Sequence, residues 1–403
     1  LDGGTGEVFE GALGTVSADY DEQDDLKTVL GWADEIRRME VWTNADKPEE
    51  AERARAYGAQ GIGLCRTEHM FREGDRLEIV RGAILVSGAA MRARAKLESG
   101  AALDAEEQAA IDTFDGAMAK LEALQQGDFE GIFEAMKGLP VVVRLIDPPL
   151  HEFLPNLEET LVEVTEAGAA ATEEQKQLLA IVQSMHEQNP MLGLRGVRLG
   201  LMIPDFVKIQ TRAILNAQVA VNKRGGDAIA KIMIPLVGHV NELSRVRGLL
   251  ETEADKIAED SGVTLDYKFG TMIEIPRGAL TADEIAKEAS FFSFGTNDLT
   301  QMAFGYSRDD AEGGFLLKYV EEKVLPFNPF PTIDATGVGQ LVEIAVQKGR
   351  AARPDIELGV CGEHGGDPES IHFFEKVGLD YVSCSPFRVP VARLAAAQAV
   401  LEQ

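Results

Sequence analysis

The chain has 403 residues, of which 45% are hydrophobic, and carries a formal net charge of −28 at pH 7. This content can bury a large core, and no apolar stretch reaches the roughly 20 residues that a membrane helix needs, so we expect a soluble globular protein. The charge argues against nucleic acid, whose binding depends on neutralising phosphates, and an anionic substrate would need local arginines and a divalent cation.

The N-terminal residues are distinct from the rest of the chain. Residues 1–16 alternate small turn residues with apolar ones, which predicts a short hairpin that belongs to a preceding domain. A charged stretch follows, with a helix predicted over 25–39. We therefore interpret residues 17–40 as a linker helix and residues 41–403 as the main domain.

Eight apolar runs in the main domain predict eight strands, with helical patterns between most of them. The runs span 41–46, 61–66, 141–146, 231–237, 270–275, 291–297, 357–362 and 381–386. Pro48 at a first helical position and Gly58 as a stop delimit the first intervening helix. Eight such units favour an α/β fold of the (β/α)8 barrel type, although the count leaves a doubly wound sheet open.

The main domain is longer than the roughly 250 residues typical of such a barrel, so it must contain insertions. A stretch rich in Ala, Glu and Met at about 72–138 predicts an inserted helical hairpin. A second helical segment is predicted at 172–188, before the loop 189–200.

Polar residues stand where the predicted strands end. A buried parallel strand should be continuously apolar, and the chemistry of a (β/α)8 barrel lies at the C-terminal ends of its strands. These ends therefore predict one site. They comprise 66–69, Arg144 with Asp147, Glu274, 295–298 and 361–364.

Arginines end two neighbouring strands of this predicted site. Arg66 and Arg144 could clamp phosphate oxygens, a task that suits the planar guanidinium better than lysine. The alternative is a pair of structural arginines bonded to carboxylates, but two of them beside a carboxylate pair favour function. Arg195 and Arg198, on the loop 189–200, could add to the phosphate pocket.

Carboxylates end two successive strands. Glu274 and Asp298 could converge on one Mg²⁺, which prefers six oxygens and keeps several waters. The alternative is a repulsive pair of carboxylates balanced by arginines. We favour the metal because it would also supply the positive charge that an anionic substrate needs in this acidic chain. Gly295 and Thr296 offer backbone N–H groups to an anion, and Asn297 could donate through its amide.

Three cysteines occur, without the spacing of a metal site. This usage suits a reducing compartment, and we predict the cytoplasm. Cys65 and Cys384 are interpreted as packing residues, whereas Cys361 ends a strand beside the polar Glu363 and His364. With an ordinary pKa of roughly 8.5, its thiol would be mostly protonated and could act as an acid or a nucleophile.

The chain starts at Leu1 with no sign of a leader, so we expect a piece of a longer protein.

Several of these strings resemble a known family. GLCRTEHMF, VVVRLIDPPLHEFLP, LRGVRLG, GTMIEIPR, FFSFGTNDLTQ and GVCGEHGGDP, in this order, resemble the C-terminal phosphoenolpyruvate (PEP)/pyruvate domain of the pyruvate, phosphate dikinases, from about residue 41 to the end. PEP synthases and the sugar phosphotransferase system's enzyme I share the arginines, the Glu and the TND segment. DPPLHEFLP, CGEHGGDP and the long insert point to the dikinases.

The resemblance implies a reaction and a role for each residue. PEP would transfer its phosphoryl group to a histidine on a swivelling domain and leave pyruvate enolate, which is then protonated. By position, Arg66, Arg144 and Arg195 would bind the phosphoryl group, and Cys361 would protonate the enolate. Glu274 and Asp298 would hold Mg²⁺ and the substrate. Gly295, Thr296 and Asn297 would also contact the substrate. A homodimer is implied as well.

The sequence departs from the whole dikinase in one respect. None of the six histidines has the Gly-rich Thr-Ser-His setting of the phosphocarrier, and no P-loop or nucleotide-binding domain is evident. We therefore expect the chain to carry only the PEP/pyruvate partial reaction, with the phosphohistidine domain as partner. Two alternatives stay open: another PEP/pyruvate barrel enzyme such as a PEP synthase, or a non-catalytic binding module.

Overall fold

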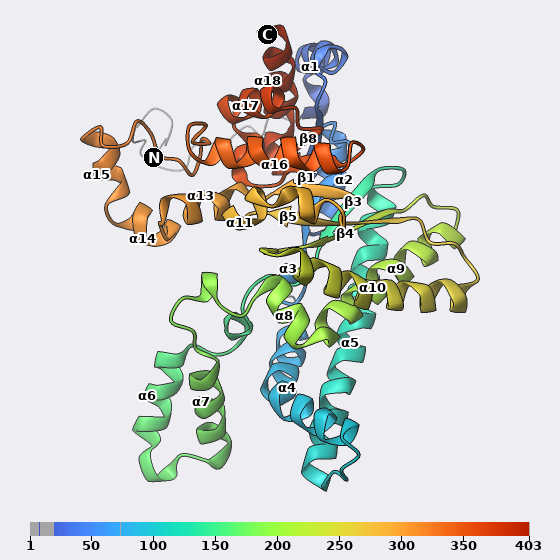
Figure 1. Cartoon of the computed structure of the whole chain (residues 1–403), viewed down its shortest axis with the longest axis vertical. Coiled ribbons are helices and arrows are strands. Elements are labelled where there is room, and N and C mark those ends of the chain that lie inside the picture. The colour runs from blue at the N-terminus through green and yellow to red at the C-terminus, as the bar shows by residue number, and fades with distance from the viewer. Residues whose placement is uncertain (1–7, 9–19, 73, 403) are drawn as a thin grey trace.

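A computed structural model describes Val8 and residues 20–72 and 74–402 (Figure 1). The predicted hairpin at 1–16 and its assignment to a preceding domain thus lie, apart from Val8, outside the described residues. The predicted helix at 25–39 is present as α1 (Asp24–Ile36). It packs on the C-terminal helix α18 (Val389–Leu401), where Asp34 pairs with the buried Arg393.

The main domain is a closed barrel of parallel strands in the order β1 to β8, which confirms the predicted (β/α)8 barrel and makes the doubly wound alternative wrong. Each predicted strand is present. The strands are β1 (Glu40–Asn44), β2 (Ile62–Arg66), β3 (Pro140–Arg144), β4 (Ile229–Ile234), β5 (Tyr267–Ile273), β6 (Phe291–Phe294), β7 (Glu357–Val360) and β8 (Tyr381–Cys384).

Several strands end earlier than predicted. The prediction carried β6 to residue 297, but the strand ends at Phe294 and a helix begins at Thr296. Gly295 makes this turn, and a Cβ at its position would collide with the Glu274 carboxylate. The polar ends of the apolar runs are therefore loops and helix starts at the rim of the barrel.

Helices follow most strands and surround the barrel (Figure 1). The larger ones between β1 and β5 are α2 (Pro48–Ala56), α4 (Arg76–Glu98), α5 (Ala105–Ala135), α6 (Leu157–Ala167), α7 (Glu173–Met185), α9 (Pro204–Lys223) and α10 (Val240–Ser261). Those beyond β6 include α13 (Thr296–Phe304), α14 (Arg308–Gly313), α15 (Leu316–Glu321), α16 (Val338–Ala352) and α17 (Pro368–Val377). Short helices are α3 (Thr67–Met70), α8 (Gly196–Met202), α11 (Pro276–Leu280) and α12 (Ala282–Ile285). No described helix combines the length and the apolar character that crossing a membrane requires.

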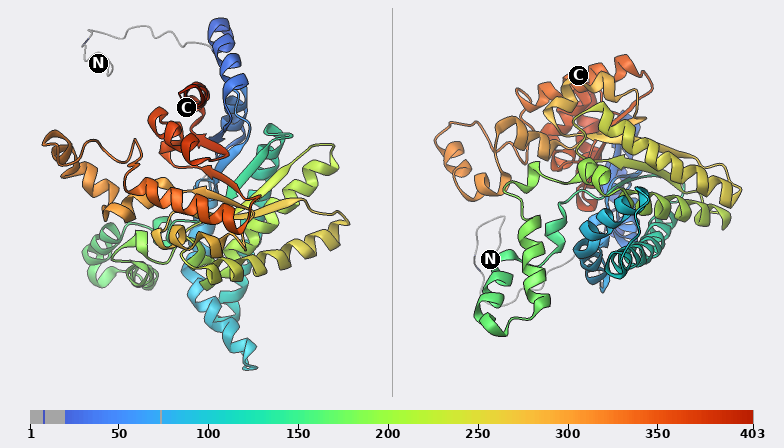
Figure 2. Two further views of the ribbon diagram at one scale, coloured as in Figure 1. Left: turned by 45° about the horizontal axis from the view of Figure 1, so that its top comes forward. Right: turned by 60° about the horizontal axis from the view of Figure 1, so that its bottom comes forward.

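Two helical excursions interrupt the barrel. The predicted hairpin at 72–138 is α4 and α5, which project away from the strands in Figure 1 and in the left view of Figure 2. Asp104 is the N-cap residue of α5 and forms a capping box. Its side chain accepts from the Glu107 backbone N–H, and the Glu107 side chain accepts from the Asp104 N–H. Because α5 also packs along α9 and α2, it serves as a wall of the barrel as well as an insertion. The second excursion, α6 and α7, includes the helix predicted at 172–188.

The interior of the barrel is filled by one side chain from each strand or its end. Trp42 and Tyr381 stack with ring centroids 3.9 Å apart, and glycines on the adjacent strands make room for such rings. The lumen, as we name this cluster, consists of Trp42, Leu64, Val142, Met233, Met272, Phe291, Cys361 and Tyr381. A filled interior of this kind is typical of a (β/α)8 barrel, whose site lies above it at the rim.

Next to the lumen lies a partly buried ion pair. Lys231 on β4 is 3% exposed, pairs with Glu357 of β7, and lies 4.6 Å from the centroid of the Trp42 ring. We expect Glu357→Ala to lower the free energy of unfolding by about 3 kcal/mol, since it leaves a buried ammonium without its partner. Urea denaturation measures this loss, and the exposed pair of Lys318 and Glu322 supplies a control, Glu322→Ala, that should change it by less than about 0.5 kcal/mol. A Glu357→Ala variant as stable as the parent would contradict the prediction.

Candidate active site

The predicted site residues lie together at the C-terminal end of the barrel. Arg66 and Arg144 end β2 and β3 and are partners in the strand register. Glu274 and Cys361 directly follow β5 and β7. Gly295 joins β6 to α13, and Thr296 to Asp298 begin that helix. Arg195 does not follow a strand directly. It stands at the start of α8, after the α6–α7 excursion, and its contact with Asp147 places it at the same rim.

A buried network of arginines and carboxylates forms one side of the site. Arg144 pairs with Glu68 and, at 3.0 Å, with Asp147, and Arg195 donates to the same Asp147 at 2.7 Å. Burial alone would lower the pKa of Arg144, but Asp147 and Glu68 raise it well above its ordinary value. The two guanidinium groups are therefore held as fixed positive charges. Arg144 makes the carboxylate contacts that the structural alternative expected of it. Arg198 instead donates to the carbonyls of Leu192 and Gly193 in its own loop.

This network leaves polar atoms that a ligand could engage. The Nε atoms of Arg144 and Arg195 are buried and have no hydrogen-bond partner among the described residues. The same is true of Oδ1 of Asp147 and Oε2 of Glu68. Unpaired buried polar atoms cost free energy, and they concentrate where a protein binds something.

Glu274 and Asp298 lie side by side under strong electrostatic repulsion. Burial, followed by the charge of Asp298, raises the pKa of Glu274 well above its ordinary value. Burial and the charge of Asp147 likewise raise the pKa of Asp298, although Arg195 and Arg144 oppose the shift. Glu274 accepts from the Leu236 N–H through one oxygen, while its other oxygen is buried without a partner among the described residues.

These two carboxylates fit the predicted Mg²⁺. They supply hard oxygen donors, and a dication would relieve both their repulsion and the unpaired oxygen of Glu274. No group of three or more His, Cys, Asp or Glu side chains in the described part of the chain is arranged to hold a metal. A magnesium ion held here would therefore take its remaining ligands from substrate oxygens and water, as this ion commonly does.

The segment after β6 is locked to the loop after β7. Thr296 is fully buried, and its hydroxyl lies 2.7 Å from Nδ1 of His364. Asn297 accepts from the backbone N–H of Glu363 at 3.1 Å through its side-chain oxygen, and both residues crowd Gly362, where a Cβ would meet them. The Thr296 side chain is thus occupied within the protein, which leaves its backbone as the part available to a ligand.

Cys361 is a buried thiol at the upper end of the lumen. It is 3% exposed, and burial raises its pKa to about 11, even though the nearby Ser293 hydroxyl lowers it. Glu274 adds to the rise, and Arg144 and Arg66 oppose it, so the thiol lies within reach of the charges on three other strand ends. At neutral pH the sulfur keeps its proton. Cys65 and Cys384, interpreted as packing residues, are also free and buried.

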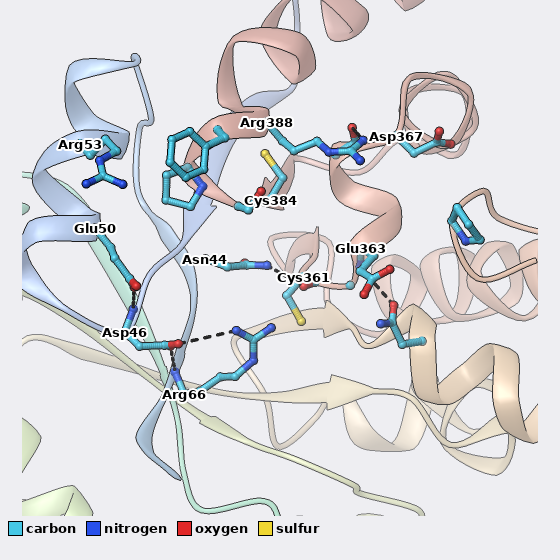
Figure 3. A pocket seen from close by; sticks show the side chains of 17 residues that line it. Asn44, Asp46, Glu50, Arg53, Arg66, Cys361, Glu363, Asp367, Cys384 and Arg388 are labelled. Atoms are coloured by element: carbon cyan, nitrogen blue, oxygen red, sulfur yellow. Dashed lines mark hydrogen bonds and ion pairs between the residues drawn. The ribbon is translucent and has the colours of Figure 1, made fainter. Parts of the chain in front are cut away.

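A cavity of about 710 Å³ opens above these residues (Figure 3). Arg66, Asn297 and Cys361 line it, and Figure 3 shows the Arg66 guanidinium and the Cys361 sulfur directed into the same space. Its outer part is formed by the ends of β1 and β8 and by the loops that follow them, including Asn44, Asp46 and Phe387. Of the predicted site residues, Arg66, Asn297 and Cys361 line this cavity, whereas its lining does not include Arg144, Arg195, Glu274 or Asp298.

The sequence matches the model of one protein family. The model describes the PEP-binding domain of PEP-utilising enzymes and matches residues 20–401. The chain belongs to the PEP-utilising enzyme family. The resemblance stated from its motifs is therefore confirmed at the level of the family and its PEP-binding domain.

Curated relatives in this PEP-utilising family are dikinases. The chain is 50% identical over its whole length to a chloroplastic pyruvate, phosphate dikinase of Flaveria pringlei and to pyruvate, phosphate dikinase 1 of Arabidopsis thaliana. It is 48% identical to the pyruvate, phosphate dikinase of Clostridium symbiosum. It covers 39% of each plant protein and 43% of the bacterial one, so it spans about two fifths of the length of these relatives.

Sequence reasoning about this PEP-binding domain missed several residues that shape the site. Asn44, at the end of β1, donates to the Cys361 carbonyl at 3.0 Å and accepts from the Ser383 hydroxyl at 2.6 Å. Tyr381 of the lumen and the buried Ser293 of β6 stand beside the thiol. A polar residue at an inward position of an otherwise apolar strand was the available signal for Ser293. The polar end of the run 41–46 was the signal for Asn44, and it was not included among the site residues.

Proposed function

We propose that this chain carries the PEP/pyruvate partial reaction of a pyruvate, phosphate dikinase. In it, a phosphoryl group passes between PEP and a phosphohistidine on a separate domain, and pyruvate enolate is protonated. The single observation that carries the proposal is the meeting, at one barrel rim, of fixed guanidinium charges, a buried carboxylate pair and a thiol that keeps its proton at neutral pH.

The arginines suit the phosphoryl end of the substrate. Arg66 lines the cavity and points into it, while Arg144 and Arg195 hold buried Nε donors outside its lining. In phosphoryl transfer the protein contributes mainly position and positive charge around the transferring group. Three guanidinium groups on separate elements would bind those oxygens and hold them while the bond to the substrate oxygen breaks.

Glu274 and Asp298 suit the carboxylate and enolate end. We propose that they hold Mg²⁺ at this end, where the ion when bound would supply Lewis-acid stabilisation of the negative charge on the substrate oxygens. The carboxylates themselves orient the substrate against the thiol. Asn297 and the backbone of Gly295 and Thr296 would fix its position from the β6 side.

Cys361 suits the methylene carbon. A general acid must hold its proton at the working pH and stand beside the atom that it protonates. The thiol meets the first condition through burial, and its place in the cavity lining with Arg66 and Asn297 supports the second. It would donate its proton to the enolate carbon and leave a thiolate, which Arg144 and Arg66 would stabilise.

Identity with curated dikinases over the whole chain favours a dikinase over a PEP synthase. The acceptor of the second phosphoryl group separates the two: phosphate for a dikinase, water for a synthase. The proposal includes the phosphohistidine domain as partner, a homodimer and a cytoplasmic location. Sedimentation of the purified chain tests the homodimer.

Calorimetric titration with oxalate, a mimic of the enolate, tests the proposed function. We expect oxalate to bind in the presence of Mg²⁺ and to bind about 100-fold more weakly after chelation or in Glu274→Gln, because the ligand and the ion share this site. Glu343→Gln, on the outer helix α16, is the control and should bind like the parent. Oxalate binding that ignores both Mg²⁺ and Glu274→Gln would contradict the proposal.

A further inference from the structure

Asp46 separates two cavities at the end of β1. It lines the 710 Å³ substrate cavity together with Arg66 and Cys361, and it also lines a neighbouring cavity of about 290 Å³ together with His69. Its side chain is only 10% exposed, and burial of an aspartate requires compensating contacts. Those contacts come from both cavities.

On the substrate side, Asp46 controls the position of Arg66. Its Oδ1 accepts the Arg66 backbone N–H at 2.6 Å, and its Oδ2 lies 3.7 Å from the Arg66 guanidinium (Figure 3). Asp46 is itself fixed, because its N–H donates to Glu50 at 2.9 Å. The end of β1 thus holds the end of β2 by a charge-assisted hydrogen bond, which is stronger than a neutral one.

On the other side, Asp46 pairs with His69. Nδ1 of His69 lies 2.7 Å from Oδ2 of Asp46, the same oxygen that faces the Arg66 guanidinium. His69 is about half exposed, so solvent can exchange its proton. One carboxylate oxygen therefore stands between a permanent cation that faces the substrate and a titratable one that does not.

We propose that Asp46 is the positioning residue for Arg66 and that His69, by balancing the charge of Asp46, leaves the charge of Arg66 available to the phosphoryl group of the substrate. The proposal rests on the function proposed above. Arg66 needs such a partner because its side chain is 35% exposed, whereas Arg144 is held on both sides by buried carboxylates.

The protonation of His69 makes the charge balance around Arg66 depend on pH. The hydrogen bond to Asp46 raises the pKa of His69 above its ordinary value. Below that pKa, His69 balances Asp46; above it, the carboxylate offsets Arg66 and repels the phosphoryl group. PEP affinity should therefore fall as the pH rises through this pKa. The other charged groups around His69 are Glu68 and Arg66 on its own segment, Lys47 and Glu49 at the start of α2, Asp128 of α5 and the Arg76 that pairs with Asp128.

Calorimetric titration of the chain with PEP and with oxalate, both in Mg²⁺, tests the inference. Asp46→Ala should weaken PEP binding by about tenfold, the effect of losing a charged hydrogen bond. It should leave oxalate binding within about twofold of the parent, because oxalate has no phosphoryl group. A general loss of structure would weaken both ligands. Asp115→Ala, which removes an exposed partner of Arg94 on the α4–α5 projection, is the control and should change neither.

His69→Gln supplies a second measurement at a half-exposed position. The ratio of PEP affinity in the parent to that in His69→Gln should fall about threefold between pH 6 and pH 9, the effect of one charge several ångströms away. The ratio cancels the titration of PEP itself. A ratio that is flat with pH, or an Asp46→Ala variant that binds PEP as the parent does, would overturn the inference. A parent chain that binds neither ligand would instead overturn the proposed function.

Discussion

Cys361→Ala is expected to slow the exchange of pyruvate methyl protons with solvent by about a thousandfold, within the range for removing a general acid or base. The thiol is the buried proton carrier at the cavity, and alanine offers no proton in its place. The measurement is loss of the methyl proton signal of pyruvate by NMR in deuterated buffer with Mg²⁺. Oxalate binding should change little, because the arginines and carboxylates stay in place.

Cys65→Ala is the matched control for this experiment. It removes a thiol of β2 that is just as buried but belongs to the main hydrophobic core and lies outside the cavity lining. Exchange should continue at the rate of the parent. If Cys361→Ala exchanged protons normally, another group would have to be the acid. If the parent itself did not exchange, the non-catalytic binding module would be the better account.

Arg144→Ala is expected to damage both stability and binding. Arg144 is 8% exposed and pairs with Glu68 and Asp147, which are themselves buried. Its loss leaves two buried carboxylates short of positive charge, so the free energy of unfolding should fall by about 3 to 5 kcal/mol. PEP binding should weaken by at least about 100-fold, since a charged donor to the phosphoryl group is lost as well. Urea denaturation and calorimetry measure the two effects.

Arg212→Ala separates these effects. Arg212 also pairs with two carboxylates, Glu122 and Glu253, but it lies on α9 away from the substrate cavity. Its loss should destabilise the chain by a smaller amount, because Arg212 is about one third exposed, and should leave PEP affinity unchanged in the folded protein. An Arg144→Ala variant that retained parental PEP affinity would remove this arginine from the proposed phosphoryl site.

Much of the fold could be predicted because buried parallel strands are apolar on both faces. Runs such as 141–146 and 357–362 were recognisable for that reason, and the barrel followed from their number. Strand ends were harder to predict. The run 291–297 contains no proline or charge before Asp298, and the end of β6 at Phe294 depends on the approach of Glu274 to Gly295, a contact between separate strands.

The residues of the candidate site could be predicted from the sequence, but the contacts between them could not. Arg66, Arg144, Glu274 and Cys361 stand at strand ends, a position that the barrel itself brings together. No local pattern indicated that Asp147 would join Arg144 to Arg195, because the contact between Asp147 and Arg195 spans 48 residues across the α6–α7 excursion. Pairings of this kind depend on loop geometry rather than on local pattern.

The place of Cys361 within the lumen links its sulfur, the proposed proton donor, to the whole interior of the barrel. Each of the other seven strands contributes one neighbour to that cluster. A change in volume at Val142 or Met272 would therefore move the sulfur relative to the rim. We expect changes to be tolerated better at surface positions such as Phe387, which lines the cavity but lies outside this cluster. Redesign of this scaffold should likewise treat its eight interior positions as a single unit.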